Sequence, residues 1–223
     1  SLGYTLAYDT RNLPQSPTSG IFASISQDFA GVGGDVQYNR LIVDTRGYYP
    51  ITNKITFVGR AQGGIIDPWG GEDLRLTDLF FKGGETIRGF DRAGYGPRDA
   101  CQDPTTGARV PNCSKDAIGG KYFWATTAEV RFPIPLIPES LGIDGAVFVD
   151  AGSLWGAGEN AIQANNVDEG SFILDTSDIR LSTGVSLIWQ SPLGPLRADL
   201  AEALLKADFD RTELFRFGAS TTF

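Results

Sequence analysis

At its C-terminus the chain reads Leu214-Phe215-Arg216-Phe217-Gly218-Ala219-Ser220-Thr221-Thr222-Phe223. Every second side chain from Phe215 to Phe223 belongs to a mostly apolar set, and the set between them, which begins with Arg216, is polar or small. Side chains on a β-strand point alternately to opposite faces of the sheet. The stretch therefore predicts a strand with one apolar face and one polar face.

Eight further segments show this period of two, so the chain carries nine strand signals. They lie near residues 2–10, 21–29, 36–50, 54–66, 122–132, 147–152, 180–189 and 196–201. Segment 36–50 alternates least clearly, and its faces are left unassigned. Charged side chains of the other segments fall opposite the apolar set: Arg60, Glu129, Arg131, Asp150, Arg180, Arg197, Asp199 and Arg216.

A polar face of this kind is the lumen of a membrane barrel or the solvent side of a soluble sandwich. Two features favour the barrel. Connections alternate between short and long, as expected when one set of turns faces the periplasm. Aromatic residues of the apolar face also lie near strand ends, as in an interfacial girdle: Tyr4, Tyr8, Trp124, Phe132, Trp189 and Phe223. We predict an all-β, antiparallel transmembrane β-barrel, with residues 1–223 as one outer-membrane domain; the alternative is an acidic all-β soluble domain.

Composition excludes several function classes. The net charge of −8 argues against nucleic-acid binding through phosphate neutralisation. No apolar run reaches the 18 or so residues of a helical membrane span. The chain has no His for a catalytic triad and no GxSxG or Walker motif, and two Cys without His are too few ligands for structural zinc. We expect no enzyme activity, cofactor or metal. Met is also absent, so we expect the natural start upstream or a removed signal peptide.

An antiparallel ring needs an even number of strands, so the nine signals do not close as they stand. We expect eight paired strands, with segment 2–10 or 36–50 merged with another strand or outside the ring. The interior of such a barrel is nearly filled by side chains, which disfavours an open pore. Alternatively, two chains could join their strand edges into a larger barrel.

The region from about 67 to 120 lacks sustained alternation, and long connections of this kind are usually functional or disordered. It contains Ile87-Arg88-Gly89-Phe90, which resembles the (V/I)RGF signature of the BamA/TamA family of outer-membrane assembly proteins. Phe148-Val149-Asp150-Ala151-Gly152 is similar to the F-x-D-x-G motif of that family, and the segment from Ser191 to Leu196 also resembles it. The resemblance covers nearly the whole chain and is to the C-terminal half of the family's barrel, without its POTRA domains.

The resemblance implies that Arg88 docks on the strand that carries Asp150 and holds the long loop inside the barrel. The planar guanidinium suits bidentate contact with a carboxylate. Asp150 and Glu129 are expected on the lumen faces of neighbouring strands, with Phe148 and Gly152 on the Asp150 face. The loop either folds into the lumen or sits over its mouth, from where Arg88 would reach down. The alternative is a solvated Arg88.

Two further features carry expectations of their own. Cys101 and Cys113 lie in the long loop, and an oxidising periplasm favours a disulfide between them over two free thiols. Such a bridge would contribute about 3 kcal/mol by the chain-entropy estimate. In the last strand, the spacing of Arg216, Gly218, Thr221 and Phe223 is similar to the C-terminal β-signal of assembly clients; the alternative is that Phe223 only anchors the strand.

The resemblance implies a role in the assembly and insertion of outer-membrane proteins, in the cell outer membrane of a Gram-negative bacterium. The implied partners are the lipid bilayer and unfolded outer-membrane client proteins, and a strand-edge homodimer is the remaining candidate. Family members usually carry POTRA domains and sixteen strands, and this chain shows neither. The alternatives are therefore a short family barrel with a purely structural role, or a small-solute channel.

Overall fold

The computed structural model describes residues 1–14, 16–31, 36–70, 74–100, 115–135, 137–157, 173–191 and 194–219. Its main feature is one antiparallel sheet of nine strands. In chain order they are β1 (Leu2–Asp9), β2 (Gly20–Ala30), β3 (Tyr38–Pro50), β4 (Thr56–Pro68), β6 (Tyr122–Pro133), β7 (Ile143–Trp155), β9 (Arg180–Ser191), β10 (Gly194–Leu205) and β11 (Phe215–Ala219). The prediction of an all-β, antiparallel structure is confirmed.

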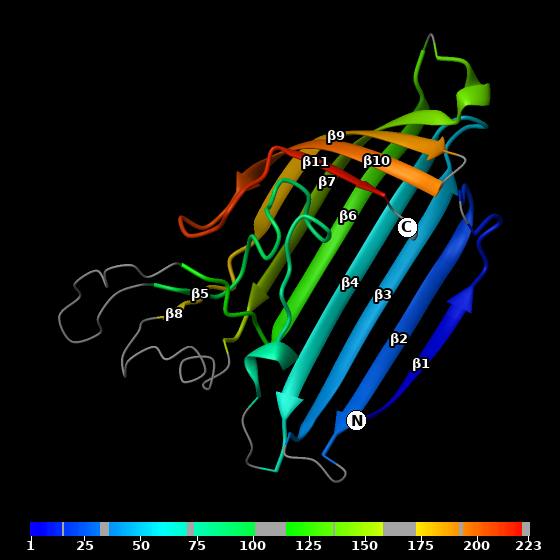
Figure 1. Ribbon diagram of the computed structural model, residues 1–223. Coiled ribbons are helices and arrows are strands. Elements are labelled where there is room, and N and C mark those ends of the chain that lie inside the picture. Colours follow the sequence, from blue (N-terminus) through cyan, green and yellow to red (C-terminus); the bar gives the residue numbers. More distant parts are fainter. Residues whose placement is uncertain are drawn as a thin grey trace.

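Each strand of this sheet pairs with the next one along the chain. The sheet curls, so that β9, β10 and β11 bend over the face on which the long loop lies (Figure 1). We call this the concave face. Among the described residues, β1 pairs only with β2 and β11 only with β10. Closure of the sheet into a ring therefore stays a prediction.

The expected eight strands are one too few for this sheet. Segment 2–10 forms β1, which pairs with β2 from Leu2 to Asp9. Segment 36–50 forms β3, which is hydrogen-bonded to β2 on one side and β4 on the other. Neither segment merges with another strand or lies outside the sheet, because each is hydrogen-bonded to its neighbours along most or all of its length.

The unclear alternation of β3 has a physical cause. Its concave side carries charged Asp44 and Arg46, but also Ile42 and Tyr38, which pack against the hydrophobic core. A face that meets water at one end and packed loop at the other carries both polar and apolar side chains. The period of two is present in the backbone but is obscured in the sequence.

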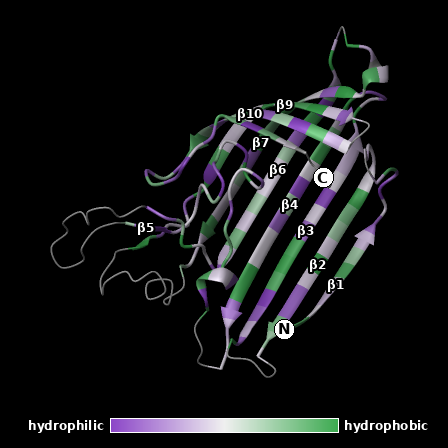
Figure 2. Ribbon diagram, viewed as in Figure 1, coloured by the Kyte–Doolittle hydropathy of each residue, from purple (hydrophilic) through white to green (hydrophobic). Residues whose placement is uncertain are grey.

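The two faces of the sheet differ as predicted. On β7, Val147 and Val149 point to the convex face and are each 45% exposed. The alternate residues Phe148 and Asp150 point to the concave face and are buried. Hydropathy alternates along the strands in the same way (Figure 2). The convex apolar face suits contact with lipid, and the concave face gathers the charged side chains.

The two longest connections leave the same end of the sheet. One joins β4 to β6 and contains the short 3-10 helix η1 (Leu76–Asp78) and β5 (Arg98–Asp99); the other joins β7 to β9 and contains β8 (Ile173–Leu174). β5 and β8 pair into a small second sheet that ties the two connections together. A second 3-10 helix, η2 (Glu139–Leu141), lies between β6 and β7. In the described part of the chain, no helix has the length and apolar character of a membrane span.

The hydrophobic core lies between the long loop and the concave face of β4, β6 and β7. It consists of loop side chains together with inward-pointing strand side chains: Ile66, Leu74, Leu79, Phe80, Ile87, Phe90, Tyr95, Ile118, Phe123, Ala125 and Leu154. The loop is therefore packed into the concavity of the sheet, with its motif residues Ile87 and Phe90 fully buried.

Candidate functional site

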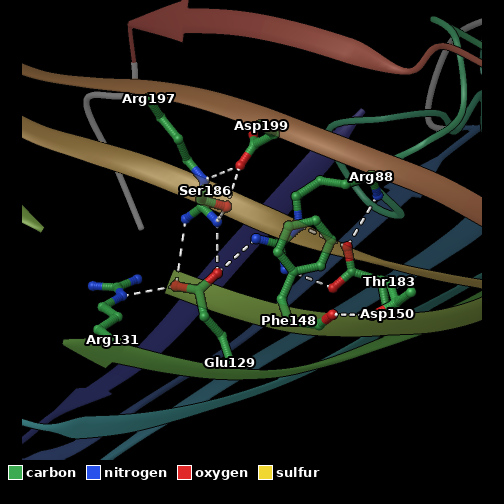
Figure 3. Close-up of polar contacts among 9 residues, drawn as sticks. All are labelled: Arg88, Glu129, Arg131, Phe148, Asp150, Thr183, Ser186, Arg197 and Asp199. Carbon is green, nitrogen blue, oxygen red and sulfur yellow. Dashed lines mark hydrogen bonds and ion pairs between the residues drawn. The ribbon is translucent and has the colours of Figure 1, made fainter. Parts of the chain in front are cut away.

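Arg88 joins the long loop to two neighbouring strands. Its Nε and Nη2 donate to the two carboxylate oxygens of Asp150, each at 2.7 Å, and its Nη1 donates to Glu129 Oε2 at 2.6 Å (Figure 3). The backbone N–H of Arg88 also donates to Asp150 Oδ2, at 3.0 Å. The structure thus brings together the loop-motif arginine and both acids that the sequence suggested as its partners.

Strand register explains why the two acids converge. Glu129 on β6 lies directly opposite Phe148 on β7, and Asp150 follows Phe148 on the same face. The Arg88 guanidinium stacks on the Phe148 ring, with its Cζ 3.4 Å from the ring centre. Phe148 therefore forms the floor of the site, with one carboxylate on each side of the stacked guanidinium.

The site is buried and its charges are matched. Glu129 and Asp150 are 3% and 1% exposed. Burial acts to lower the pKa of Arg88, but the hydrogen bonds and charge of Asp150, together with the charge of Glu129, outweigh it and raise that pKa above its ordinary value. Arg88 is therefore permanently charged, and removing it would leave two buried carboxylates with less compensation.

Glu129 is shared by three arginines. Besides Arg88, it accepts from Arg131 Nε at 2.8 Å and from Arg197 Nη2 at 2.6 Å. Arg197, on β10, also donates to Asp199 Oδ1 at 2.7 Å and to Ser186 Oγ at 2.7 Å. A charged network therefore runs across β6, β7, β9 and β10 beneath the docked loop (Figure 3).

Part of this network was not predicted from the sequence. Arg131, Arg197 and Asp199 were expected to face the lumen, but not to share Glu129. Ser186 is uncharged and was not among the residues singled out on the polar face. The period of two in the sequence indicated which side chains face inward. It did not indicate that the sheet curls enough to bring β10 back toward β6.

The motif glycines meet two different demands. Gly89 has a φ of +89°, in the left-handed region that L-residues other than glycine rarely adopt. Gly152 allows close approach instead: a Cβ there would lie 2.5 Å from the carbonyl oxygen of Trp124 and 2.9 Å from Cδ1 of Ile87. Gly152 therefore makes room for the motif isoleucine against the strands.

The loop is also attached to the connection between β10 and β11, residues 206–214. Asp91 N donates to Arg211 O at 3.0 Å, and Arg211 N donates to Gly94 O at 2.8 Å. Phe90 and Thr212 form an antiparallel bridge beside these bonds. The docked loop thus contacts the last hairpin as well as β6 and β7.

An ion pair with fully buried side chains fixes the 206–214 connection. Arg180 Nε, at the start of β9, donates to Asp210 Oδ2 at 3.0 Å. Arg180 also donates to the carbonyl oxygens of Thr176 and Asp178. Asp210 therefore holds the connection against the end of β9, where the loop residues meet it.

The terminal-strand residues fall into two groups. Arg216 points toward the loop: its Nη2 lies 2.7 Å from Glu213 Oε2 and donates to Phe90 O at 3.2 Å. Gly218 pairs with Arg197 in the β10–β11 register. Thr221 and Phe223 lie outside the described residues, and so do Cys101 and Cys113.

A cavity of about 760 Å³ opens between the loop and the concave face. Its lining includes Arg46, Arg60, Lys82 and Arg88, with Glu129 of the docking network. Within the described ranges, no group of three or more His, Cys, Asp or Glu side chains is arranged to hold a metal ion. The arrangement is suited to holding a loop and to binding through charge.

Comparison with known proteins places this geometry in context. Residues 1–223 match the sequence profile of the Omp85 superfamily domain. The outer membrane protein assembly factor BamA of Neorickettsia risticii (strain Illinois) is 31% identical over 208 residues, which cover 93% of this chain and 25% of that protein. BamA of Neisseria meningitidis serogroup B is 26% identical over 223 residues, covering 93% of this chain and 26% of that protein.

Among solved structures, the crystal structure of BamA from Haemophilus ducreyi lacking POTRA domains 1–3 is similar to this chain. The TM-score is 0.80 at 28% sequence identity, and the match covers 96% of this chain and 41% of that chain. The chain thus spans about a quarter of the length of the BamA relatives (25% and 26%) and less than half of this solved chain.

Proposed function

The chain belongs to the Omp85 superfamily, and from this premise we propose that it takes part in the assembly and insertion of outer-membrane proteins. The membership confirms the resemblance predicted from Ile87-Arg88-Gly89-Phe90 and the Asp150 motif. The relatives named above are assembly factors rather than enzymes, in agreement with the sequence. Neither a purely structural role nor a small-solute channel gains support from them.

One observation carries the proposal: the Arg88 loop is held against the concave face of an amphipathic sheet. The convex face presents apolar side chains to a bilayer, and the concave face holds the loop through Asp150 and Glu129. A rigid, loop-filled wall of this kind leaves the sheet edges as the places where another strand can be added. Edge strands template further pairing through their free N–H and C=O groups.

Location and partners follow from the same premise. We assign the chain to the outer membrane of a Gram-negative bacterium, with the lipid bilayer against its convex face and unfolded outer-membrane proteins as its clients. The BamA relatives from Neorickettsia and Neisseria support this assignment. Arg216, Gly218, Thr221 and Phe223 are proposed as a terminal-strand signal that the assembly process recognises.

The strand edges also allow a homodimer. Within the part of the chain that the structure describes, β1 and β11 each have one neighbour. These edges could pair with each other in one chain or with the edges of a second chain. The mass of the purified protein in detergent distinguishes the two arrangements: twice the chain mass supports the edge-paired dimer, and a single chain mass excludes it.

The assembly proposal is tested by reconstitution into liposomes. An unfolded outer-membrane barrel protein is added, and its folding is followed by heat-modifiable gel mobility. We expect faster client folding than in empty liposomes, and loss of the acceleration in Arg88→Ala. Arg75→Ala is the matched control, because Arg75 is an exposed arginine of the same loop. Client folding at the rate of empty liposomes would contradict the proposal, and salt-dependent conductance in its place would favour a channel.

A further inference from the structure

One wall of the cavity beneath the loop carries an excess of positive charge, because the carboxylates next to it are fewer than its cationic side chains. We call it the cationic wall; it consists of Arg46 on β3, Arg60 on β4 and Lys82 of the loop. It lines the same cavity as the docking network, but its ion pairs are separate from those of the network, where Arg88, Arg131 and Arg197 are matched by Glu129, Asp150 and Asp199.

Arg46 and Arg60 are direct cross-strand partners in the β3–β4 register. Like charges placed directly opposite each other destabilise a sheet. Both guanidiniums contact the carboxylate of Asp44: Arg46 Nη2 lies 2.7 Å and Arg60 Nη2 2.9 Å from Asp44 Oδ2. One negative charge thus serves two positive charges, and the strand pair keeps a net positive charge that faces the cavity.

Lys82 adds a second uncompensated charge. Its Nζ lies 4.1 Å from the centre of the Phe123 ring, and no carboxylate forms an ion pair with it within the described ranges. Burial lowers the pKa of Lys82, and the charges of Arg60 and Arg40 act in the same direction against the attraction of Glu85. The charged ammonium is therefore held where a negative group would stabilise it.

We propose that the cationic wall binds a small multivalent anion that carries phosphate or carboxylate groups. Guanidinium groups bind both kinds of oxyanion through charge-assisted hydrogen bonds. The cavity volume of about 760 Å³ lies within the range of small-molecule sites. The site is formed by residues other than Arg88 and its carboxylate partners, so it does not depend on the proposed assembly activity.

Calorimetric titration of the full chain in a zwitterionic detergent tests this site, with inorganic pyrophosphate and citrate as separate probes. We expect saturable binding of at least one probe, which weakens as sodium chloride is added. Lys82→Gln should weaken binding about tenfold, the effect of losing one charge-assisted contact. Lys206→Gln, which removes the same charge from an exposed turn after β10, should leave binding unchanged.

A second variant changes binding in the opposite direction. Asp44→Asn removes the carboxylate that the two arginines share, so both guanidiniums become available and the anion should bind more tightly. Binding of pyrophosphate alone would identify a phosphate site, and binding of citrate alone a carboxylate site. No saturable binding of either probe, or equal affinities in wild type, Lys82→Gln and Asp44→Asn, would overturn the proposal.

Discussion

Arg88 is the side chain through which the long loop and the sheet meet. Its guanidinium stacks on Phe148 and contacts two carboxylates that are almost completely buried. Breaking a buried ion pair by removing one partner is costly, because the remaining charge loses its compensation away from water. At the scale of single residues, Arg88 therefore stabilises the folded protein mainly by compensating the buried negative charges of Glu129 and Asp150.

Arg88→Ala should destabilise the protein by about 3–5 kcal/mol. The physical reason is the uncompensated charge of Asp150, with a smaller effect at Glu129, which keeps Arg131 and Arg197. Urea unfolding in detergent, followed by tryptophan fluorescence, measures the change. Arg75→Ala is the control, and an equal loss of stability in the two variants would contradict a docked Arg88.

Gly152→Ala tests the close approach of the loop to the strands. The added Cβ would overlap the backbone of β6 and the side chain of Ile87, at a cost of about 1–3 kcal/mol. Gly47→Ala is the matched control in β3, because a Cβ there meets no atom within 4 Å. The same unfolding measurement should show Gly47→Ala within about 0.5 kcal/mol of wild type. Similar losses in both variants would argue against this packing.

The contacts of Arg88 could be predicted because the family resemblance implied that the loop docks through Arg88 and strand alternation supplied its acidic partners. Ile87-Arg88-Gly89-Phe90 stands out in the sequence, and the period of two placed Asp150 and Glu129 on one face. Arg197 and Ser186 could not be assigned in this way. Their contact with Glu129 and its neighbours depends on how far the sheet curls between β6 and β10, which is a property of the assembled strands.

At the scale of elements, the loop and the last hairpin form one connected unit. The 206–214 connection pairs with loop residues Phe90 to Gly94 and is fixed to β9 by the Arg180–Asp210 ion pair. Among the described residues, β11 has a strand neighbour only on the β10 side, and a strand paired on one side leaves its other backbone groups without a ladder. The connection therefore stabilises β11 from outside the sheet and links its position to that of the docked loop.

Asp210→Asn should loosen this unit. Arg180 would lose its carboxylate in a fully buried position, so the 206–214 connection should open more often. We expect amide hydrogen exchange of this segment to rise at least about tenfold. Asp208→Asn, at an exposed aspartate of the same turn, is the control. Equal exchange rates in the two variants would show that the ion pair does not hold the connection.

Strand positions followed the period of two more closely than strand lengths did: segment 147–152 became β7 (Ile143–Trp155), and segment 196–201 became β10 (Gly194–Leu205). All nine strand signals correspond to strands, but β3 was treated as one of two candidates for exclusion. Its inward side chains Ile42 and Tyr38 pack against the loop core, so a tertiary contact removed the contrast between its faces. The pairing of β5 with β8 could not be predicted from the sequence either, because such short segments in separate loops carry no periodic signal.

At the scale of the whole molecule, the nine-stranded sheet is a curved wall with a loop packed on one side. The convex face offers exposed apolar side chains such as Val147, Val185 and Leu187 to lipid. The concave face carries the docking network, the hydrophobic core of the loop and the cavity. Membership in the Omp85 superfamily and the similarity to a BamA barrel fit this arrangement.

The central claim is that the loop is held on the wall by direct contact between Arg88 and Asp150. A double-mutant cycle with Arg88→Ala, Asp150→Ala and the combined variant tests it most directly, with the free energy of unfolding of the whole protein as the readout. Contacting residues couple, so we predict that the combined loss falls short of the sum of the single losses by about 1–3 kcal/mol. Losses that add to within about 0.5 kcal/mol would contradict the claim, since they would mean that the two side chains act independently.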